Sequence, residues 1–161
     1  MAPVQKASVE IDMLNLLISL AEEYFDAAHG LAPSVAASMT PENVDTYQKL
    51  IATGLSCLET ALKNVKLPPR MEAIIRLRYA GVLYEETEDS IEAETALTRG
   101  IALCDRVCKC APFIGLSNRN VQNHYNDIKY AMQFLLAQFL SKKNPKAAMK
   151  TLDSQVAEAV L

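Results

Sequence analysis

Three cysteines and a histidine are the residues of this sequence best suited to do chemistry. Cys104, Cys108 and Cys110 could be drawn with His124 as a Cys₃His zinc site, and Cys104 and Cys108 share one helical face. The close C-x₂-C pairs of structural zinc sites are missing, however, and free cysteine is a common core residue. We therefore expect no metal and no cofactor, and reduced thiols inside a cell.

Other residues that could do chemistry carry only weak signals. The sequence has no phosphate-binding loop, no G-x-S-x-G and no H-E-x-x-H, and its two histidines and five glycines leave little material for an active site. His29 is expected at a helix end, where the dipole favours a cation. Four lysines around one turn could contact phosphate, but such groups more often serve solubility: Lys142, Lys143, Lys146 and Lys150. We expect a protein that is not an enzyme.

The composition favours helices. The chain has 161 residues, a one-domain length, of which 50% are hydrophobic and only 6% aromatic, with no Trp. The net charge of −3 disfavours direct binding of nucleic acid by this piece. No apolar run reaches the length of about 18 residues that a membrane span needs, and the N-terminus lacks a signal-sequence pattern.

The clearest helical pattern is RLRYAGVLYEETEDSIEAETALTRGIALC, residues 76–104. Apolar and small residues recur three and four apart on both sides of the polar turn EETEDS, which predicts two helices folded back on each other. Glycine inside a helix costs roughly 1 kcal/mol relative to alanine, so the glycines indicate positions where two backbones approach closely. The spacing is typical of the tetratricopeptide (TPR) repeat. Its residues are Leu77, Ala80, Gly81, Tyr84, Ala93, Leu97 and Gly100.

Two further stretches repeat this spacing. We therefore predict a single domain with an all-α, TPR-like solenoid of three antiparallel helix pairs, over approximately residues 9–66, 70–110 and 121–160. The last residues, DSQVAEAVL, read as the middle of a helix without a stop signal. We expect the chain to be an N-terminal fragment of a longer solenoid.

The first unit is predicted to contain a long loop. Residues 1–8 read as a loose tail, Ser8 as a helix cap, and the first helix should run to about Ala28. Gly30 and Pro33 should end that helix, since both residues interrupt helical patterns. Thr40-Pro41-Glu42 then starts a second helix that should run to about Val65. The residues with the repeat spacing are Leu17, Leu20, Ala21, Tyr24, Gly54, Leu58 and Ala61.

The third unit is predicted to begin near Val121. Asn144 and Pro145 form a cap and first helical position for its second helix. The interval from Tyr84 to Ala93 equals that from Phe139 to Ala148, so the registers of the two units agree. The other residues that repeat the spacing are Met132, Leu135, Leu136 and Leu152, with Gln155 where a small residue is preferred.

Two blocks of the sequence resemble the cohesin-loading-factor family. The first is LETALKNVKLPPRMEAIIRLRYAGVLYEETEDSIEAETALTRGIALCDR and the second is DIKYAMQFLLAQFLSKKNPKAAMKTLD. Together they cover about half of the chain, and KLPPR, RLRYAGVLYEET and KKNPKAA make the resemblance more specific than a TPR pattern alone. The segment CKCAPFIGLSNRNVQNHYN between the blocks matches no pattern of that family.

The resemblance implies a function and a partner. The family is the smaller, TPR-built subunit of the cohesin loader, here in a fungal-like version. Its superhelix wraps an extended segment at the N-terminus of the large HEAT-repeat loader subunit, and the pair loads cohesin onto chromatin. The resemblance therefore implies a nuclear protein that meets cohesin and chromatin indirectly, and a chain shorter than full-length members.

The first helix of each pair in such an array lines the concave surface, where we predict a partner-binding groove. Its apolar side chains should bury those of an extended peptide, and Glu22, Glu85 and Glu86 should pair with Lys or Arg. The alternative is that the apolar groups pack on neighbouring repeats and the acids are solvated. The predicted residues are Asn15, Ile18, Glu22, Phe25, Asp26, Ile75, Arg78, Val82, Glu85, Glu86, Tyr130, Gln133, Ala137 and Leu140.

A second function remains open, that of a generic TPR adaptor for another peptide, such as a chaperone tail. Chaperone-binding TPR units present a basic clamp for a carboxylate. The predicted groove positions are instead mostly acidic or apolar, with Arg78 as the exception, which argues against that clamp. A small helical enzyme or metal protein is the third alternative, supported only by the cysteines.

Overall fold

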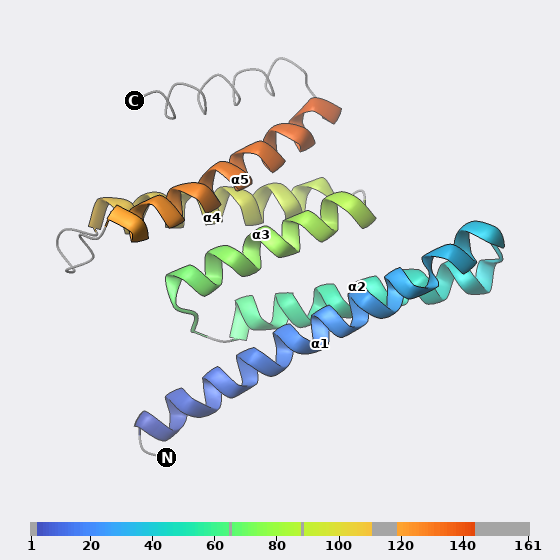
Figure 1. The fold of residues 1–161 in the computed structure, drawn as a ribbon, viewed down its shortest axis with the longest axis horizontal. Helices are drawn as coiled ribbons and strands as arrows, with labels where there is room; N and C mark the ends of the chain where they lie inside the picture. The colour runs from blue at the N-terminus through green and yellow to red at the C-terminus, as the bar shows by residue number, and fades with distance from the viewer. Residues whose placement is uncertain (1–2, 65, 88, 111–118, 144–161) are drawn as a thin grey trace. The chain divides into compact units, whose positions relative to one another are not determined.

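The computed structural model describes residues 3–64, 66–87, 89–110 and 119–143, and these form five α-helices without a strand (Figure 1). The predicted all-α class is confirmed over this part of the chain. The chain divides into two compact units, Met1–Lys66 and Leu67–Leu161. None of the described helices is both long and apolar enough to cross a membrane.

The first unit is an antiparallel hairpin of α1 (Pro3–Ala37) and α2 (Pro41–Asn64). Its core forms because each helix places buried residues three, four or seven apart, on the face that meets the other helix. The buried residues of α1 are Leu14, Ala21, Phe25 and Ala28, and those of α2 are Ile51, Gly54, Leu55, Leu58 and Ala61.

The start of α2 agrees with the prediction from Thr40-Pro41-Glu42. The hydroxyl oxygen of Thr40 accepts a hydrogen bond from the backbone N–H of Asn43 at 3.3 Å, which satisfies one of the free donors of the first turn. The side-chain amide of Asn43 donates to the carbonyl of Ser38 at 3.1 Å. The helix ends at Asn64, close to the predicted Val65.

The predicted bounds of the first helix are wrong. The helix begins at Pro3 rather than at Ser8, and it continues through Gly30 and Pro33 to Ala37. Pro3 suits a first helical position because its missing N–H has no intrahelical acceptor there. Beyond Gly30, half-buried side chains such as Leu31 and Val35 extend the packed face, which compensates for helix-breaking residues that local propensity would not tolerate.

The N-terminal part of α1 extends beyond α2. The helix α1 has 35 residues and α2 has 24, a difference of eleven (35 − 24). The short connection from Ala37 to Pro41 places the start of α2 beside the end of α1, so the excess falls at the N-terminus of α1, as Figure 1 shows. Leu14 is accordingly the first buried residue of α1 among those described.

The second unit contains α3 (Pro69–Glu86), α4 (Ser90–Cys110) and α5 (Arg119–Lys143). A tight turn joins α3 to α4, as predicted. The backbone N–H of Thr87 donates to the carbonyl of Leu83 at 3.1 Å and closes the last turn of α3. The carboxylate of Asp89 accepts from the N–H of Glu92 at 3.3 Å and caps α4. The helix α5 packs against both α3 and α4.

Glycines allow close packing in both units, but one of the glycines predicted to do so does not. A Cβ atom on Gly54 would lie 2.4 Å from Cε1 of Phe25, and a Cβ atom on Gly100 would lie 2.6 Å from Sδ of Met132. These glycines therefore make room for single large side chains. The prediction for Gly81 is wrong, because a Cβ atom there would have no heavy atom within 4 Å.

The predicted third pair is described only in its first helix. Met132 and Phe139 of α5 are buried, with 0% and 4% of their surfaces exposed, as the repeat spacing predicts. The predicted second helix, with Asn144, Pro145, Ala148, Leu152 and Gln155, lies outside the described residues, as do Lys146 and Lys150.

Candidate partner-binding surface

The predicted groove residues on α1 divide between surface and core. Asn15 and Asp26 are exposed, and Ile18 and Glu22 are partly exposed. These four residues are three or four positions apart and so follow one strip of the helix. Phe25, in contrast, is only 1% exposed because its ring fills the space over Gly54. The expectation that Phe25 faces a ligand is wrong, and the residue belongs to the hairpin core.

The predicted residues on α3 show the same division. Ile75 and Val82 are 3% and 4% exposed, so the expectation that they are exposed is wrong. The physical reason is that α3 buries two faces: Ile75 and Val82 are on one with Tyr79, Ala73 and Ala80 are on the other, and Leu83 lies between them. Glu85 is exposed, and Arg78 and Glu86 are partly exposed. These three charged residues remain candidates for contact with a partner.

The predicted residues on α5 are mostly at the boundary between core and surface. Tyr130, Gln133 and Leu140 are partly exposed, whereas Ala137 is only 4% exposed and is not a surface residue as expected. The side-chain oxygen of Gln133 is buried and accepts no hydrogen bond within the described part of the chain. A buried acceptor without a donor is unfavourable by about 1–3 kcal/mol, so this oxygen makes the side chain of Gln133 energetically costly where it lies.

Aromatic and cationic side chains connect the end of α3 to α5. The rings of Tyr84 and Phe139 meet edge to face with centroids 5.0 Å apart. The ammonium group of Lys142 lies 4.1 Å from the centroid of the Tyr84 ring, within the range of a cation–π interaction. Lys142, one of the four clustered lysines, therefore has a packing role in the second unit.

Two polar contacts position α5 in the second unit. The Nε–H of Arg70 donates to Nε2 of His124 at 3.0 Å and joins the start of α3 to α5. The ammonium group of Lys129 lies 3.1 Å from Oδ1 of Asp105, and Lys129 is only 9% exposed. A buried ammonium group needs such a partner, because removal from water without one is costly.

The cysteines do not assemble into the metal site that could be drawn from the sequence. Burial raises the pKa of Cys104 to about 11, with smaller contributions from Cys108 and Asp105. Burial also raises the pKa of Cys108, whose Sγ donates to Oδ1 of Asn126 at 3.7 Å. A raised pKa opposes the thiolate form that metals bind. Among the described residues, no group of three or more His, Cys, Asp and Glu is placed to hold a metal ion.

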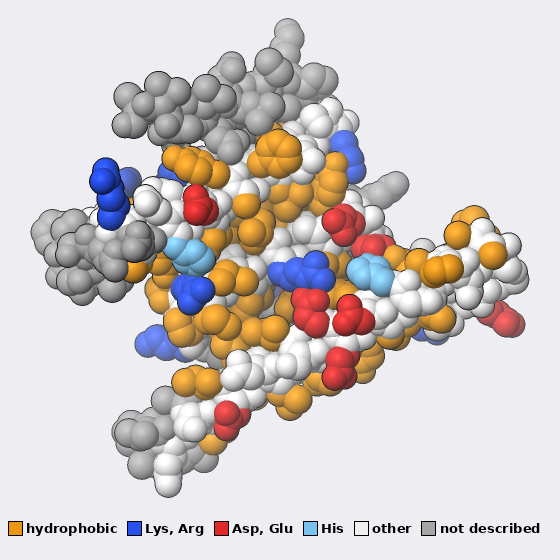
Figure 2. Space-filling model, in the orientation of Figure 1, with side chains coloured by type: hydrophobic (Ala, Val, Ile, Leu, Met, Phe, Trp, Pro, Cys, Tyr) orange, Lys and Arg blue, Asp and Glu red, His pale blue; other side chains and the backbone are white. Residues whose placement is uncertain are grey.

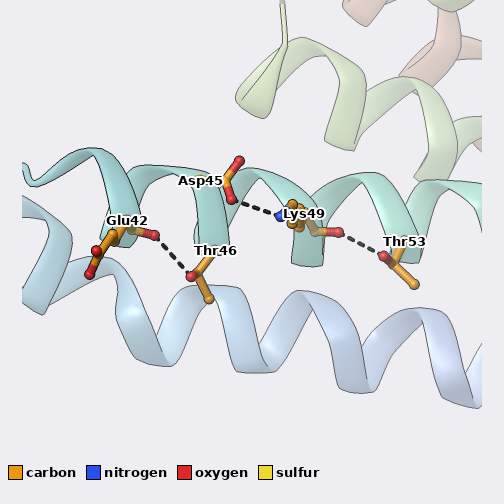
Figure 3. A network of polar contacts seen from close by, with 5 residues as sticks. All are labelled: Glu42, Asp45, Thr46, Lys49 and Thr53. Atoms are coloured by element: carbon orange, nitrogen blue, oxygen red, sulfur yellow. Dashed lines mark hydrogen bonds and ion pairs between the residues drawn. The ribbon is translucent and has the colours of Figure 1, made fainter.

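One network of polar contacts lies within a single helix. On α2, Lys49 forms an ion pair with Asp45 at 2.8 Å. The hydroxyls of Thr46 and Thr53 donate to the carbonyls of Glu42 and Lys49, four residues earlier (Figure 3). The hydrogen bond that the ammonium group of Lys49 donates to the carboxylate of Asp45 is the main reason that the pKa of Lys49 is raised. All five residues are exposed, so these contacts stabilise α2 itself.

Two features of α1 were not expected from the sequence. His29 lies inside the helix rather than at its end, because α1 continues to Ala37. The second feature is a row of exposed apolar side chains in the N-terminal half of α1. Val9 is 52%, Met13 41% and Leu16 59% exposed. Their spacing of four and three residues was the available signal.

Comparison with known proteins identifies a family for this chain. A sequence model of the family described as cohesin loading factor matches residues 13–110 and 114–160. The match extends well before Leu58, where the first resembling block begins. It also includes nearly all of the segment CKCAPFIGLSNRNVQNHYN, which lies between the two blocks. No curated protein and no solved structure matches the chain.

Proposed function

Because the chain belongs to the cohesin loading factor family, we propose that it is a scaffold that binds an extended segment of the large HEAT-repeat subunit of the cohesin loader. The family match over residues 13–110 and 114–160 is the observation that carries this proposal. The proposed role places the protein in the nucleus, where the two subunits together load cohesin onto chromatin and so support sister chromatid cohesion.

The proposed contacts use only those predicted groove residues that reach the surface. Ile18, Tyr130 and Leu140 are partly exposed and offer apolar contact area to the segment. Glu22, Glu85 and Glu86 offer carboxylates to its Lys or Arg side chains. The remaining polar positions that reach the surface are Asn15, Asp26, Arg78 and Gln133.

A charge reversal with a matched control tests the charge pairing. Glu85 on α3 and Glu92 on α4 are both exposed acids, and α4 carries no predicted groove residue. Glu85→Arg and Glu92→Arg therefore change the net charge equally. We expect Glu85→Arg to weaken binding of the N-terminal segment of the large loader subunit roughly fivefold at low salt, which corresponds to about 1 kcal/mol. The loss should shrink at moderate salt because screening weakens exposed ion pairs. Glu92→Arg should change the affinity less than about twofold.

Fluorescence anisotropy with a labelled segment measures these affinities. Unchanged affinity of Glu85→Arg at both salt concentrations would contradict the charge pairing, and equal losses in both variants would show only long-range attraction. Failure of the wild-type chain to bind the segment would contradict the proposed function itself. A chaperone C-terminal peptide serves as the negative probe, and its binding would favour the generic adaptor.

A further inference from the structure

The N-terminal part of α1 carries an apolar row that no other helix described in its own unit covers. Val9, Met13 and Leu16 are 52%, 41% and 59% exposed, and Leu20 continues the row and is partly exposed. The residues are four, three and four positions apart, so they share one side of the helix over about 17 Å. We call these four residues the outer row. They start in the part of α1 that extends beyond α2 (Figure 1).

The outer row is separate from the face that packs on α2. Leu14 of the packed face follows Met13 directly in sequence and therefore points about 100° away from it. Ala21 and Phe25 continue the packed face and are 0% and 1% exposed. The hairpin core is thus complete without the outer row, whose apolar side chains remain in water. Large apolar side chains gathered on an exposed helix face are typical of a binding surface.

The outer row also has an acidic border. Asp12 is three residues after Val9 and four before Leu16, and Glu23 is three residues after Leu20, so both lie along the same edge of the row. Both carboxylates are exposed. The whole of α1 has five acidic residues and one lysine. Acidic and hydrophobic side chains both reach the surface along α1 in Figure 2.

We propose that the outer row is a docking face for an amphipathic helix of a partner protein whose apolar side is bordered by Lys or Arg. Apolar side chains of the two helices would interlock, and the basic border would meet Asp12 and Glu23. A second copy of this chain fits less well, because antiparallel pairing of two outer rows brings the two acidic edges together. The acidic border likewise opposes an anionic lipid surface.

The outer row is independent of the proposed groove. Ile18 and Glu22 of the groove strip lie on the opposite side of α1 from Leu16 and Leu20, since residues two apart on a helix differ by about 200°. The family match begins at residue 13, so Val9 and Asp12 precede it. A partner on the outer row could therefore bind the chain at the same time as a segment in the groove.

Two synthetic helical peptides of about 18 residues test the proposal by fluorescence anisotropy with the full chain. Both carry the same row of leucines, bordered by lysines in one peptide and by glutamates in the other. We expect the lysine-bordered peptide to bind at least about tenfold more tightly than the glutamate-bordered one. Leu16→Glu should weaken its binding at least about tenfold. This variant adds an acid, so a purely electrostatic attraction would become stronger instead.

Ile91→Glu is the matched control, because Ile91 of α4 is 74% exposed and lies outside the outer row. It should change the affinity less than about twofold. Met13→Glu repeats the test at a second position, and circular dichroism confirms that each variant is folded. The proposal is overturned if neither peptide binds, if both bind equally, or if Leu16→Glu and Ile91→Glu behave alike. If the wild-type chain instead associates with itself and Leu16→Glu abolishes this self-association, the outer row binds a second copy of the chain and the proposal is overturned.

Discussion

Gly54 and Gly30 lie in the same hairpin but in opposite surroundings. A Cβ atom on Gly54 would approach Cε1 and Cδ1 of Phe25 to 2.4 Å and 2.8 Å, whereas a Cβ atom on Gly30 would meet nothing within 4 Å. The ring of Phe25 is rigid and almost fully buried, so it can move away only by disturbing the core. The absence of a side chain is therefore required at Gly54 and not at Gly30.

The two alanine substitutions should have effects of opposite sign. Gly54→Ala should lower the free energy of unfolding by roughly 1–3 kcal/mol, because overpacking outweighs the gain in helix propensity. Gly30→Ala should raise it by about 0.5–1 kcal/mol. Urea denaturation followed by circular dichroism measures both. A stabilising Gly54→Ala would show that Phe25 does not pack over this position.

Cys104 should make stability depend on pH in the alkaline range. Its pKa is raised from 9.0 to about 11 on folding, mainly by burial. A raised pKa in the folded state means that the contribution of the neutral thiol is complete below pH 9 and is lost as the pH rises towards 11. The wild-type chain should therefore lose stability over this range more steeply than Cys104→Ala. Denaturation curves at several pH values check this, and equal slopes would contradict the burial of the thiol.

At the scale of elements, α1 shows how packing can override local signals. Pro33 cannot donate a hydrogen bond to the carbonyl four residues earlier, yet it lies inside a helix that continues to Ala37. Leu31 and Val35 on either side of it are partly buried. The tertiary contacts of these side chains hold the segment helical at the expense of one backbone hydrogen bond.

Pro33→Ala should restore that hydrogen bond. We expect the free energy of unfolding of the first unit to rise by up to about 3 kcal/mol, since Pro33 is exposed and its ring makes little core contact. Thermal unfolding and the helical circular dichroism signal measure the change. If residues 30–37 formed a loop, the substitution would give no increase in helicity. Ser34→Ala is the control, because it adds an alanine to the same segment without restoring a backbone hydrogen bond.

Most helix bounds could be predicted from the sequence because start signals and periodicity agreed. Thr40 and Pro41 mark the start of α2, and the polar turn EETEDS separates α3 from α4 as predicted. The C-terminal end of α1 could not be predicted, because glycine and proline such as Gly30 and Pro33 usually end a helix when only the neighbouring residues are considered. Only the contacts with α2, which depend on residues distant in sequence, decide whether the helix continues.

The candidate site was less predictable than the fold. A helical face can be read from spacing, but α3 buries two faces, so Ile75 and Val82 could not be assigned to a groove or to the core by period alone. The same ambiguity applied to Phe25, whose burial depends on Gly54 of another helix. Charged residues were more reliable, because Glu85 and Asp26 are indeed exposed.

At the scale of the whole molecule, the two units differ in charge. Residues 1–66 contain eight acidic and four basic residues, a net charge of −4, while residues 67–161 contain eleven acidic and twelve basic residues, a net charge of +1. The first hairpin therefore carries the excess negative charge. Basic partners are expected to meet this unit first at low salt.

Division into units also predicts where a core substitution acts. Leu97 of α4 is 0% exposed, and Leu97→Ala should cost roughly 2–5 kcal/mol of stability. We expect hydrogen exchange to increase mainly in 69–110 and 119–143 and much less in 3–64, because compact units open separately. Native-state exchange with mass spectrometry measures this. An equal increase in both units would indicate a single cooperative structure.

The short connection between α1 and α2 has a consequence for biosynthesis. The buried partners of Leu14, Ala21 and Phe25 on α2 all precede residue 65, so this hairpin has every residue of its core before the second unit leaves the ribosome. Local contacts of this kind form quickly, and domains acquire structure from the N-terminus during translation. The nascent chain can therefore display its outer row to a partner while the remaining helices are still being made.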